Sequence, residues 1–359
     1  MLETAEKYVA YVGTYTIGES KGIYVFNMEP FTGKWELLYT VSAVENPSYL
    51  AISKDRRHLY SVGETNEFNG RESGAAASFS IDERTGRLKF INMQASGGRA
   101  PCHIAADAGN MWLFVANYAE GTVSIFSIES DGSISKESNV IYHKGSGPVL
   151  DRQEKAHAHF VGLTPDEKFL CAVDLGIDRI VVYDFNGIDG KLKALHEKSV
   201  PVRPGAGPRH MDFHPGGRFA YLLNELTSDI VVLEYAGSAF RQVQFISALP
   251  QGYSGESYAA AIHVSRDGKF LYASNRGHDS IASYRIDGNS GRLHLLAHTS
   301  TGGRFPRDFA IDPTGRYLYA ANQYTGNIVQ FKISDSGVPV PTGYEMEVPD
   351  AVCIKFGSF

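Results

Sequence analysis

The sequence has few cysteines and no long apolar run. Among its 359 residues are only 3 cysteines, Cys102, Cys171 and Cys353, which lie far apart and form no Cys-x-x-Cys pair. An odd number of scattered cysteines indicates no disulfide framework. No apolar stretch approaches the ~20 residues of a membrane-spanning helix. The first residues, MLETAEK, lack the apolar core of a signal peptide. We therefore expect a cytoplasmic protein that does not bind membranes.

Blocks of like charge are also missing. The formal net charge is −6 and no segment forms a basic face, so nucleic-acid binding has no support. The apolar share of 43% and the charged share of 21% are typical of a soluble globular protein. No linker divides the chain, and we predict a single domain over residues 1–359. Its 37 glycines, 20 tyrosines and 20 phenylalanines suit many short strands joined by tight turns.

An internal repeat of about fifty residues organises the chain. In one complete copy, Pro208 opens an alternating apolar segment, Pro215-Gly216 forms a turn, and a second apolar segment ends at Asn224-Glu225. A third apolar segment runs from Ile230 to Tyr235, and this order predicts consecutive short strands. Several copies continue through a Gly turn into a weak fourth strand. The opening position recurs every 47 to 57 residues, at Pro47, Pro101, Ala158, Pro208, Ala259 and Pro306.

The two ends of the chain together supply one more copy. Tyr8 to Thr14 matches a second strand and Gly22 to Met28 matches a third, but no first strand precedes them. Residues 349–356 repeat the first-strand pattern at the other end of the chain. Six complete units and one shared unit make seven. Four-stranded units at this period, without a helical stretch, predict an all-β fold. We expect a seven-bladed β-propeller of antiparallel four-stranded blades, with one blade closed by both termini.

Equivalent residues of the repeat should form rings around the central channel, because the first strand of each blade lines it. The residue after the opening position gives one ring: Ser48, Cys102, His159, Arg209, Ala260, Arg307 and Asp350. The residue after the end of the second strand gives another: Thr14, Glu64, Tyr118, Leu175, Glu225, Arg276 and Gln323. A scaffold needs no charge at these positions, whereas charged groups with perturbed pKa values cluster at functional sites. The rings therefore predict an active site at one end of the channel.

The charged members of the rings indicate chemistry on a small anion. Arginine forks such as those of Arg209, Arg276 and Arg307 suit carboxylates or phosphates. A carboxylate or imidazole beside them could move a proton, which makes Glu225 and His159 the candidate bases. For Arg209 and Glu225 alone, a structural ion pair across neighbouring strands is an equally good interpretation.

Two further patterns allow a metal site, which we do not favour. His157 and His159 are two residues apart and could bind a metal from one strand face, but we favour hydrogen-bonding or active-site histidines. His103 and His210 fall one position past the ring, where packing between blades is expected. The ends of the second strands carry mostly Asn and Asp, which suit turns but could also offer oxygen ligands to a divalent cation. These residues are Gly63, Asn117, Asp174, Asn224, Asn275 and Asn322.

Several motifs together resemble one known family. They are Tyr11-Val12-Gly13-Thr14-Tyr15-Thr16, Pro101-Cys102-His103, Ala156-His157-Ala158-His159, Gly207-Pro208-Arg209-His210-Met211, Asn224-Glu225 and Ser274-Asn275-Arg276-Gly277. Over essentially the whole chain, the sequence is similar to the seven-bladed propeller lactonases, which include bacterial 6-phosphogluconolactonases and fungal carboxymuconate cyclases. The resemblance implies a cytoplasmic, metal-independent enzyme that hydrolyses 6-phosphoglucono-1,5-lactone in the pentose phosphate pathway.

The resemblance also implies roles for individual residues. The catalytic His, Arg, Glu and second Arg of the family correspond to His159, Arg209, Glu225 and Arg276. We expect five further residues to bind the substrate: His157, Arg307, Glu64, His103 and Gln323. No metal and no cofactor is expected. The expected partner is a small anionic lactone, and the expected assembly is a monomer or a weak homodimer.

Three other functions are compatible with the same pattern. A cycloisomerase of the carboxymuconate type would use the arginines to bind carboxylates and would move a proton to carbon. A non-enzymatic propeller would dock partners on a blade face, although its channel rings should then be apolar or small. A lactonase dependent on a divalent cation would use the ring of Asn and Asp residues.

Overall fold

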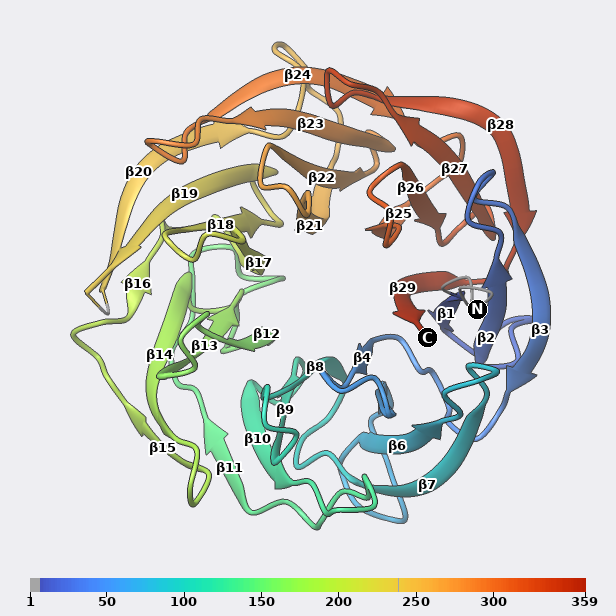
Figure 1. Ribbon diagram of the computed structural model, residues 1–359. Helices are drawn as coiled ribbons and strands as arrows, with labels where there is room; N and C mark the ends of the chain where they lie inside the picture. Colours follow the sequence, from blue (N-terminus) through green and yellow to red (C-terminus); the bar gives the residue numbers. More distant parts are fainter. Residues whose placement is uncertain (1–6, 238) are drawn as a thin grey trace.

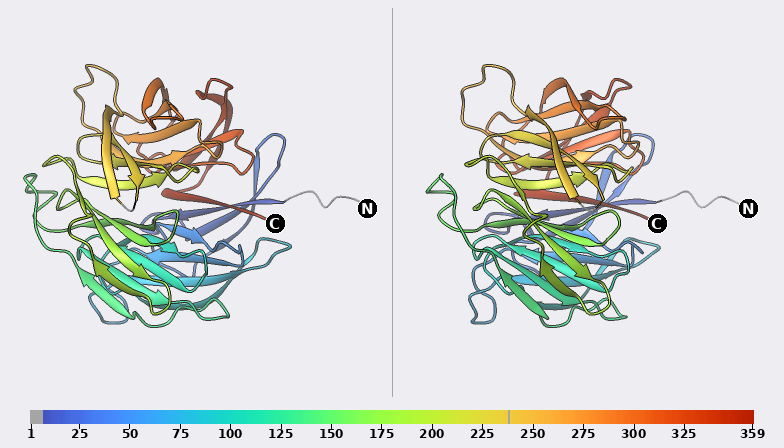
Figure 2. Two further views of the ribbon diagram at one scale, coloured as in Figure 1. Left: turned by 60° about the vertical axis from the view of Figure 1, so that its left-hand side comes forward. Right: turned by 90° about the vertical axis from the view of Figure 1, so that its left-hand side faces the viewer.

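The computed structural model describes residues 7–237 and 239–359. Every regular element in these ranges is a β-strand, and the strands form seven antiparallel sheets arranged as blades around a central axis (Figure 1). The two side views of Figure 2 show this ring from the side, with the sheets of neighbouring blades next to one another. The predicted all-β, seven-bladed propeller is confirmed.

Blades 1 to 4 comprise the chain ends and the first half of the sequence. Blade 1 contains β29 (Ala351–Ser358), β1 (Tyr8–Thr14), β2 (Ile23–Met28) and β3 (Trp35–Val41). Blade 2 contains β4 (Leu50–Ile52), β5 (His58–Gly63), β6 (Ala75–Ile81) and β7 (Leu88–Ala95). Blade 3 contains β8 (Pro101–Ala106), β9 (Trp112–Asn117), β10 (Thr122–Ser127) and β11 (Asn139–Tyr142). Blade 4 contains β12 (Ala158–Leu163), β13 (Phe169–Asp174), β14 (Arg179–Asn186) and β15 (Lys191–Ala194), with β16 (Val200–Pro201) also paired to β14.

Blades 5 to 7 follow the predicted repeat. Blade 5 contains β17 (Pro208–Phe213), β18 (Phe219–Asn224), β19 (Asp229–Ala236) and β20 (Ala239–Ser247). Blade 6 contains β21 (Tyr258–Val264), β22 (Phe270–Arg276), β23 (Ser280–Ile286) and β24 (Leu293–Ser300). Blade 7 contains β25 (Pro306–Ile311), β26 (Tyr317–Asn322), β27 (Asn327–Ile333) and β28 (Pro339–Glu347). The fourth strands of these blades have eight or nine residues, longer than the weak returns that the sequence suggests.

Blade 1 closes the ring with strands from both ends of the chain. β29 pairs antiparallel with β1, from Tyr8 opposite Ser358 to Thr14 opposite Ala351. In Figure 1 the red β29 lies beside the blue β1, next to the channel. Closure leaves no open strand edge between the first and last blades. The prediction that the termini share one blade is confirmed.

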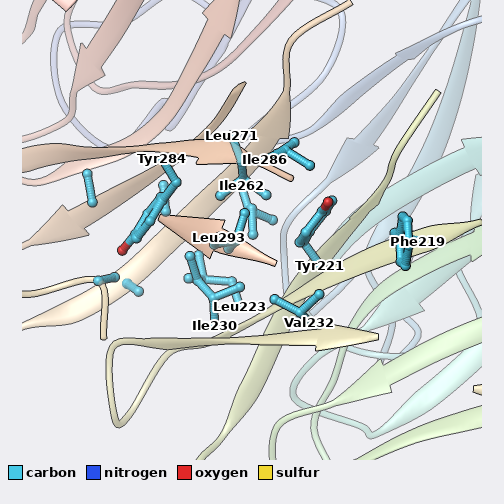
Figure 3. Close-up of a cluster of buried hydrophobic side chains, with 14 residues drawn as sticks. Phe219, Tyr221, Leu223, Ile230, Val232, Ile262, Leu271, Tyr284, Ile286 and Leu293 are labelled. Carbon is cyan, nitrogen blue, oxygen red and sulfur yellow. The ribbon is translucent and has the colours of Figure 1, made fainter. Parts of the chain in front are cut away.

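The core consists of seven buried clusters, one at each interface between neighbouring blades. Figure 3 shows the cluster between blades 5 and 6, where Tyr221 and Leu223 of β18 meet Ile262, Leu271 and Tyr284 of blade 6. Second strands such as β18 are buried along their whole length because both of their faces pack against neighbouring blades. Fourth strands alternate towards solvent at the outer rim.

The Gly turns of the repeat also connect neighbouring blades. The hydroxyl of Tyr11 in blade 1 donates to the carbonyl of Gly86 in blade 2 over 2.8 Å. Tyr221 in blade 5 donates in the same way to Gly291 in blade 6 over 3.1 Å. Gly86 and Gly291 have φ values of 71° and 69°, which few other residues adopt without strain. The hydroxyls of Tyr11 and Tyr221 are thereby satisfied by the next blade.

Closure of the ring gives a prediction about stability. Ile354 of β29 is 2% exposed and belongs to the cluster between blades 7 and 1. We expect Ile354→Ala to lower the free energy of unfolding by about 2–5 kcal/mol, as for other buried Ile-to-Ala changes. Chemical denaturation measures this change. Val340→Ala, on the exposed side of β28, is the control and should stay within about 0.5 kcal/mol of the parent. Equal stability of the two variants would contradict a closure that depends on β29.

Candidate active site

In several blades, a β-bulge on the first strand directs the side chain of the first predicted ring into the channel. In blade 5, Pro208 pairs with Asn224 and His210 pairs with Leu223, so Arg209 has no partner residue on β18. The same irregularity isolates Cys102, His159 and Arg307 in their blades. A bulged residue leaves the alternation of its strand, and bulges next to active sites re-aim side chains. In these four blades the repeat therefore presents one bulged side chain to the channel.

A left-handed backbone residue lies two positions before several of these bulges. Ala100, Gly207 and Phe305 have φ values of 50°, 60° and 64°. A Cβ atom on Gly207 would lie 2.4 Å from Cγ of Leu226, so the turn at Gly207 requires glycine for space as well as for conformation. Phe305 adopts this conformation at a strain cost, which is typical of residues held at functional sites.

Blade 1 departs from the predicted rings. Thr14 pairs with Ala351 and Gly13 with Cys353, so the bulged residue is Val352. Asp350, with a φ of 52°, takes the place of Ala100 and Phe305 in the turn. The predictions for Asp350 and Thr14 are therefore wrong, because Thr14 is the paired end of its strand. Tyr15 follows that end and occupies the second ring instead.

Glu225 is at the centre of the charged cluster. It is 2% exposed, and its Oε2 lies 2.8 Å from a terminal nitrogen of Arg276 and 3.0 Å from Nε of Arg209. Its Oε1 accepts a hydrogen bond from Arg152. Both carboxylate oxygens are thus occupied by guanidinium groups from three segments of the chain. The two-strand pairing of Arg209 with Glu225 is present, but it is one part of a larger cluster.

The cluster perturbs the pKa values of its members. Burial raises the pKa of Glu225, but Arg276, Arg209 and the other neighbouring positive groups outweigh burial and hold it well below its ordinary value. Burial and the adjacent guanidiniums of Arg276 and Arg307 lower the pKa of Arg209 to about 10. Glu225 is therefore ionised, and it stabilises the charged state of buried arginines that would otherwise repel one another.

Arg209 and Arg276 each keep one terminal nitrogen free of hydrogen bonds to the described residues. Arg209 uses Nη1 for the carbonyl of Ala260 and for His210, and Nε faces Glu225. Arg276 uses Nε and Nη2 for two carbonyls of β21 and for Glu225. Within the described chain, Nη2 of Arg209 and Nη1 of Arg276 have no hydrogen-bond partner. These donors are available to an anionic ligand.

His159 lies beside this cluster. It is 5% exposed, and its Nδ1 is 3.6 Å from Sγ of Cys102. The ring of Tyr118 packs edge-on against it, with centroids 5.3 Å apart. Burial, together with the charge of Arg209, lowers the pKa of His159 well below its ordinary value. The imidazole is therefore neutral near pH 7, and its Nε2 has no partner among residues 7–237 and 239–359.

A second charged group contains Glu64 and Arg307. The carboxylate of Glu64 accepts hydrogen bonds from Tyr15, 2.9 Å from each oxygen, and from Ser48. The guanidinium of Arg307 lies 5.3 Å from the centroid of the Tyr15 ring. Arg307 forms no hydrogen bond or ion pair with any other described residue. It is a half-buried cation without a direct counter-ion.

The other substrate-binding candidates have different surroundings. His157 stacks on Tyr118, donates from Nδ1 to the Tyr118 carbonyl over 2.9 Å, and lies 3.1 Å from Glu154 through Nε2. Both of its ring nitrogens are thus occupied by the protein. His103 packs between the rings of Tyr49 and Phe160, as the position past the ring suggests. Gln323 is half-buried, and its Oε1 has no hydrogen-bond partner in the described chain. Their substrate contacts stay predictions.

Sequence reasoning missed Arg152, which comes from a loop instead of the repeat. The loop between β11 and β12 projects from one face of the ring, on the side away from the C-terminus (Figure 2). Its Arg152 reaches Glu225 and lies over the ring of Tyr258, 5.4 Å from the centroid. The only signal in the sequence is the length of this irregular segment, since long loops carry function. Its side chain could not be placed from the repeat.

The ring of Asn residues ties blades together. The side-chain nitrogens of Asn117, Asn275 and Asn322 donate to the carbonyls of Ser96, Ala248 and Thr301, each in the connection that leads in from the preceding blade. These amides therefore have a structural role that needs no cation. Among the described residues, no group of three or more His, Cys, Asp or Glu side chains could hold a metal ion. No helix long and apolar enough to cross a membrane occurs in that part of the chain.

Comparisons of the sequence with known proteins agree on one family. The family model described as "Lactonase, 7-bladed beta-propeller" matches residues 9–356. A 6-phosphogluconolactonase of Bacillus subtilis is 40% identical over 353 residues, which cover 98% of each chain. A 6-phosphogluconolactonase of Formosa agariphila is 36% identical over 354 residues, covering 97% of each chain.

Solved structures agree with the sequence relatives. The periplasmic gluconolactonase of Pseudomonas aeruginosa superposes with a TM-score of 0.92 at 34% identity, covering 98% of this chain and 99% of that one. A protein of Lactobacillus plantarum superposes with a TM-score of 0.89 at 33% identity, with the same coverage of both chains. Both similarities extend over nearly the complete ring.

Proposed function

Because the chain belongs to the lactonase family of seven-bladed β-propellers, we propose that it hydrolyses 6-phosphoglucono-1,5-lactone to 6-phosphogluconate, as a step of the pentose phosphate pathway. The names of the two curated relatives support this substrate. We place the reaction in the cytoplasm, although one similar structure is that of a periplasmic enzyme. A single domain, and a monomeric or weakly dimeric state, stay predictions.

The observation that carries the proposal is the excess of positive charge at the channel mouth. Four guanidiniums, of Arg152, Arg209, Arg276 and Arg307, meet only two carboxylates in a protein whose formal net charge is −6. Clefts lined by one sign of charge concentrate ligands of the opposite sign. The site therefore favours a small anion such as a sugar phosphate.

The free donors suggest how the carbonyl is activated. Attack of water on the lactone carbonyl places negative charge on its oxygen, and fixed donors aimed at that oxygen stabilise the transition state. Nη2 of Arg209 and Nη1 of Arg276 are unpartnered donors that Glu225 holds in place. Arg307, which forms no direct ion pair within the described part of the chain, would hold the phosphate. Glu225 thus acts by fixing the arginines.

The surroundings of Glu225 argue against its candidate role as the general base. Both of its oxygens are already in ion-pair contact with guanidiniums, and a carboxylate whose pKa is lowered is a weak base. His159 keeps a free Nε2 and stays neutral, so it can accept a hydrogen bond from the attacking water. We assign His159 to orienting this water.

A substrate panel measured with and without chelator tests the proposal. We expect saturable hydrolysis of 6-phosphoglucono-1,5-lactone that EDTA does not change, because arginines supply the positive charge that a metal ion would supply. Loss of activity with EDTA and recovery with calcium would instead identify a cation-dependent lactonase. Conversion of a carboxymuconate substrate, with no phospholactone hydrolysis, would identify a cycloisomerase of the same family.

A further inference from the structure

The carboxyl group of Glu64 lies in the channel and has no role in the chemistry described so far. It follows β5 in blade 2, the position that Glu225 occupies after β18 in blade 5. Both residues therefore belong to the second ring at the same end of the channel. Glu64 is half-buried, whereas Glu225 is 2% exposed. Glu64 is thus the more accessible of the two carboxyl groups.

Neutral donors hold Glu64 in place. The hydroxyl of Tyr15 donates to it from 2.9 Å, and the hydroxyl of Ser48 donates to Oε2. No guanidinium or ammonium group in the described chain lies within ion-pair distance of this carboxylate. Hydroxyl donors orient a carboxylate without neutralising its charge, so it can still accept a proton. Glu225 lacks this freedom because three guanidiniums occupy it.

The two carboxyl groups differ in electrostatics as they differ in contacts. Burial raises the pKa of Glu64 above its ordinary value, although Arg307, Ser48 and Tyr15 act in the opposite direction. The pKa of Glu225 is shifted downwards. Where two titratable groups of one site are shifted apart, the environment separates their acid–base roles. A carboxylate with the higher pKa is the stronger base.

We propose that Glu64 is the catalytic base of the site and that Tyr15 and Ser48 are positioning residues that orient it. This assignment rests on the proposed lactonase function. Glu64 takes a proton from the water while the water oxygen forms its bond to the lactone carbonyl carbon. The bond from that carbon to the ring oxygen then breaks, and Glu64 returns the proton to the ring oxygen. The new carboxylic acid releases its own proton to solvent, so Glu64 ends the cycle ionised.

The pH dependence of the reaction follows from this role. Glu64 must be ionised to accept a proton, so kcat/KM falls as the pH is lowered through the pKa of Glu64. Four titratable groups face it from neighbouring segments: Tyr15, Cys102, Arg209 and Arg307. The hydrogen bond from Tyr15 favours the ionised form, so its removal raises the pKa of Glu64. Tyr15→Phe should therefore move the acid limb of the profile to higher pH.

Two variants of the full-length enzyme test the proposal with 6-phosphoglucono-1,5-lactone as the probe. Glu64→Gln keeps the shape of the side chain and should lower kcat/KM by about 10²–10⁴-fold, the usual contribution of general-base catalysis. Tyr15→Phe should retain substantial activity and show the shifted acid limb. The matched control is Glu45→Gln, an exposed carboxylate on the connection before β4 that also carries Ser48, which should keep both the rate and the profile of the parent.

The possible results separate this proposal from the lactonase function itself. An active parent with an equally active Glu64→Gln variant would overturn the Glu64 assignment alone. An unmoved acid limb in Tyr15→Phe would overturn it too, even if Glu64→Gln failed to fold. A parent enzyme that opens no phospholactone would overturn the function, and the assignment with it. A large loss in Glu64→Gln together with a shifted limb in Tyr15→Phe would support the assignment.

Discussion

Replacement of Glu225 by glutamine should reduce kcat/KM for phospholactone hydrolysis by at least about 10²-fold, the cost of losing one well-placed oxyanion donor. The reason is indirect, because Glu225 fixes Arg209 and Arg276 and a neutral amide cannot hold both guanidiniums. Stability should fall as well, by about 3–5 kcal/mol, since three buried or half-buried guanidiniums lose their counter-ion. Steady-state kinetics and chemical denaturation measure the two effects.

A carboxylate outside the channel gives the matched control for Glu225. Glu234 is paired with Arg218 and Arg241 on the rim of blade 5, so Glu234→Gln also removes an ion-pair partner of two arginines. We expect its turnover to equal that of the parent. If Glu225→Gln and Glu234→Gln had the same kcat/KM, the role of Glu225 in catalysis would be refuted.

The pH dependence of the unfolding free energy distinguishes the contribution of the charge of Glu225 from the contribution of its side-chain shape. The folded-state pKa of Glu225 lies below its ordinary value of 4.5, so its stabilising contribution is present above that value. The contribution is lost as the pH falls through the folded-state pKa. The difference in unfolding free energy between the parent and Glu225→Gln should therefore be largest near pH 7 and should shrink in acid. A constant difference across this range would indicate that charge is not the cause.

Arg276 gives the second large effect. Its Nη1 is free, while its other nitrogens bind two backbone carbonyls and Glu225. Arg276→Ala should lower kcat by about 10²–10³-fold, as expected for loss of an oxyanion donor. Arg276→Lys should recover little of this loss, because an ammonium group cannot reproduce the planar fork. Kinetics with 6-phosphoglucono-1,5-lactone measure both variants.

The control for Arg276 comes from the same blade. Arg285 lies on β23 with an exposed side chain, so Arg285→Ala changes the charge by the same amount without touching the channel. It should keep the parent kcat and KM. Full activity in Arg276→Lys would show that positive charge alone is sufficient and would contradict a role for directed donors.

The repeat made most of the fold predictable. Pro208, the turn at Pro215-Gly216 and Asn224-Glu225 define three strands of one blade, and the same order at equal spacing defines the others. Closure by β29 was predictable because the first strand is missing at the beginning of the chain. The repeat also placed Arg209, Glu225, Arg276 and His159 at one end of the channel, since equivalent positions must lie in rings.

The repeat could not provide the contacts that depart from it. Counting along the repeat places Thr14 in the second ring. In the structure Thr14 is the paired end of β1, and Tyr15 occupies the ring position instead. Arg152 lies in the long connection between β11 and β12, outside the strands of the repeat. The different roles of Glu64 and Glu225 depend on which neighbours reach each carboxyl group, and some of those neighbours, such as Tyr15 and Arg276, come from other blades. Such contacts between distant segments are set by packing and have no local signal.

The most direct test is the initial rate of 6-phosphoglucono-1,5-lactone ring opening by purified parent enzyme and by Glu225→Gln purified in the same way, each compared with spontaneous hydrolysis. The proposed function predicts a saturable rate well above the spontaneous one for the parent and a rate lower by at least about 10²-fold for the variant. A parent rate equal to spontaneous hydrolysis, or equal rates for the two proteins, would contradict it.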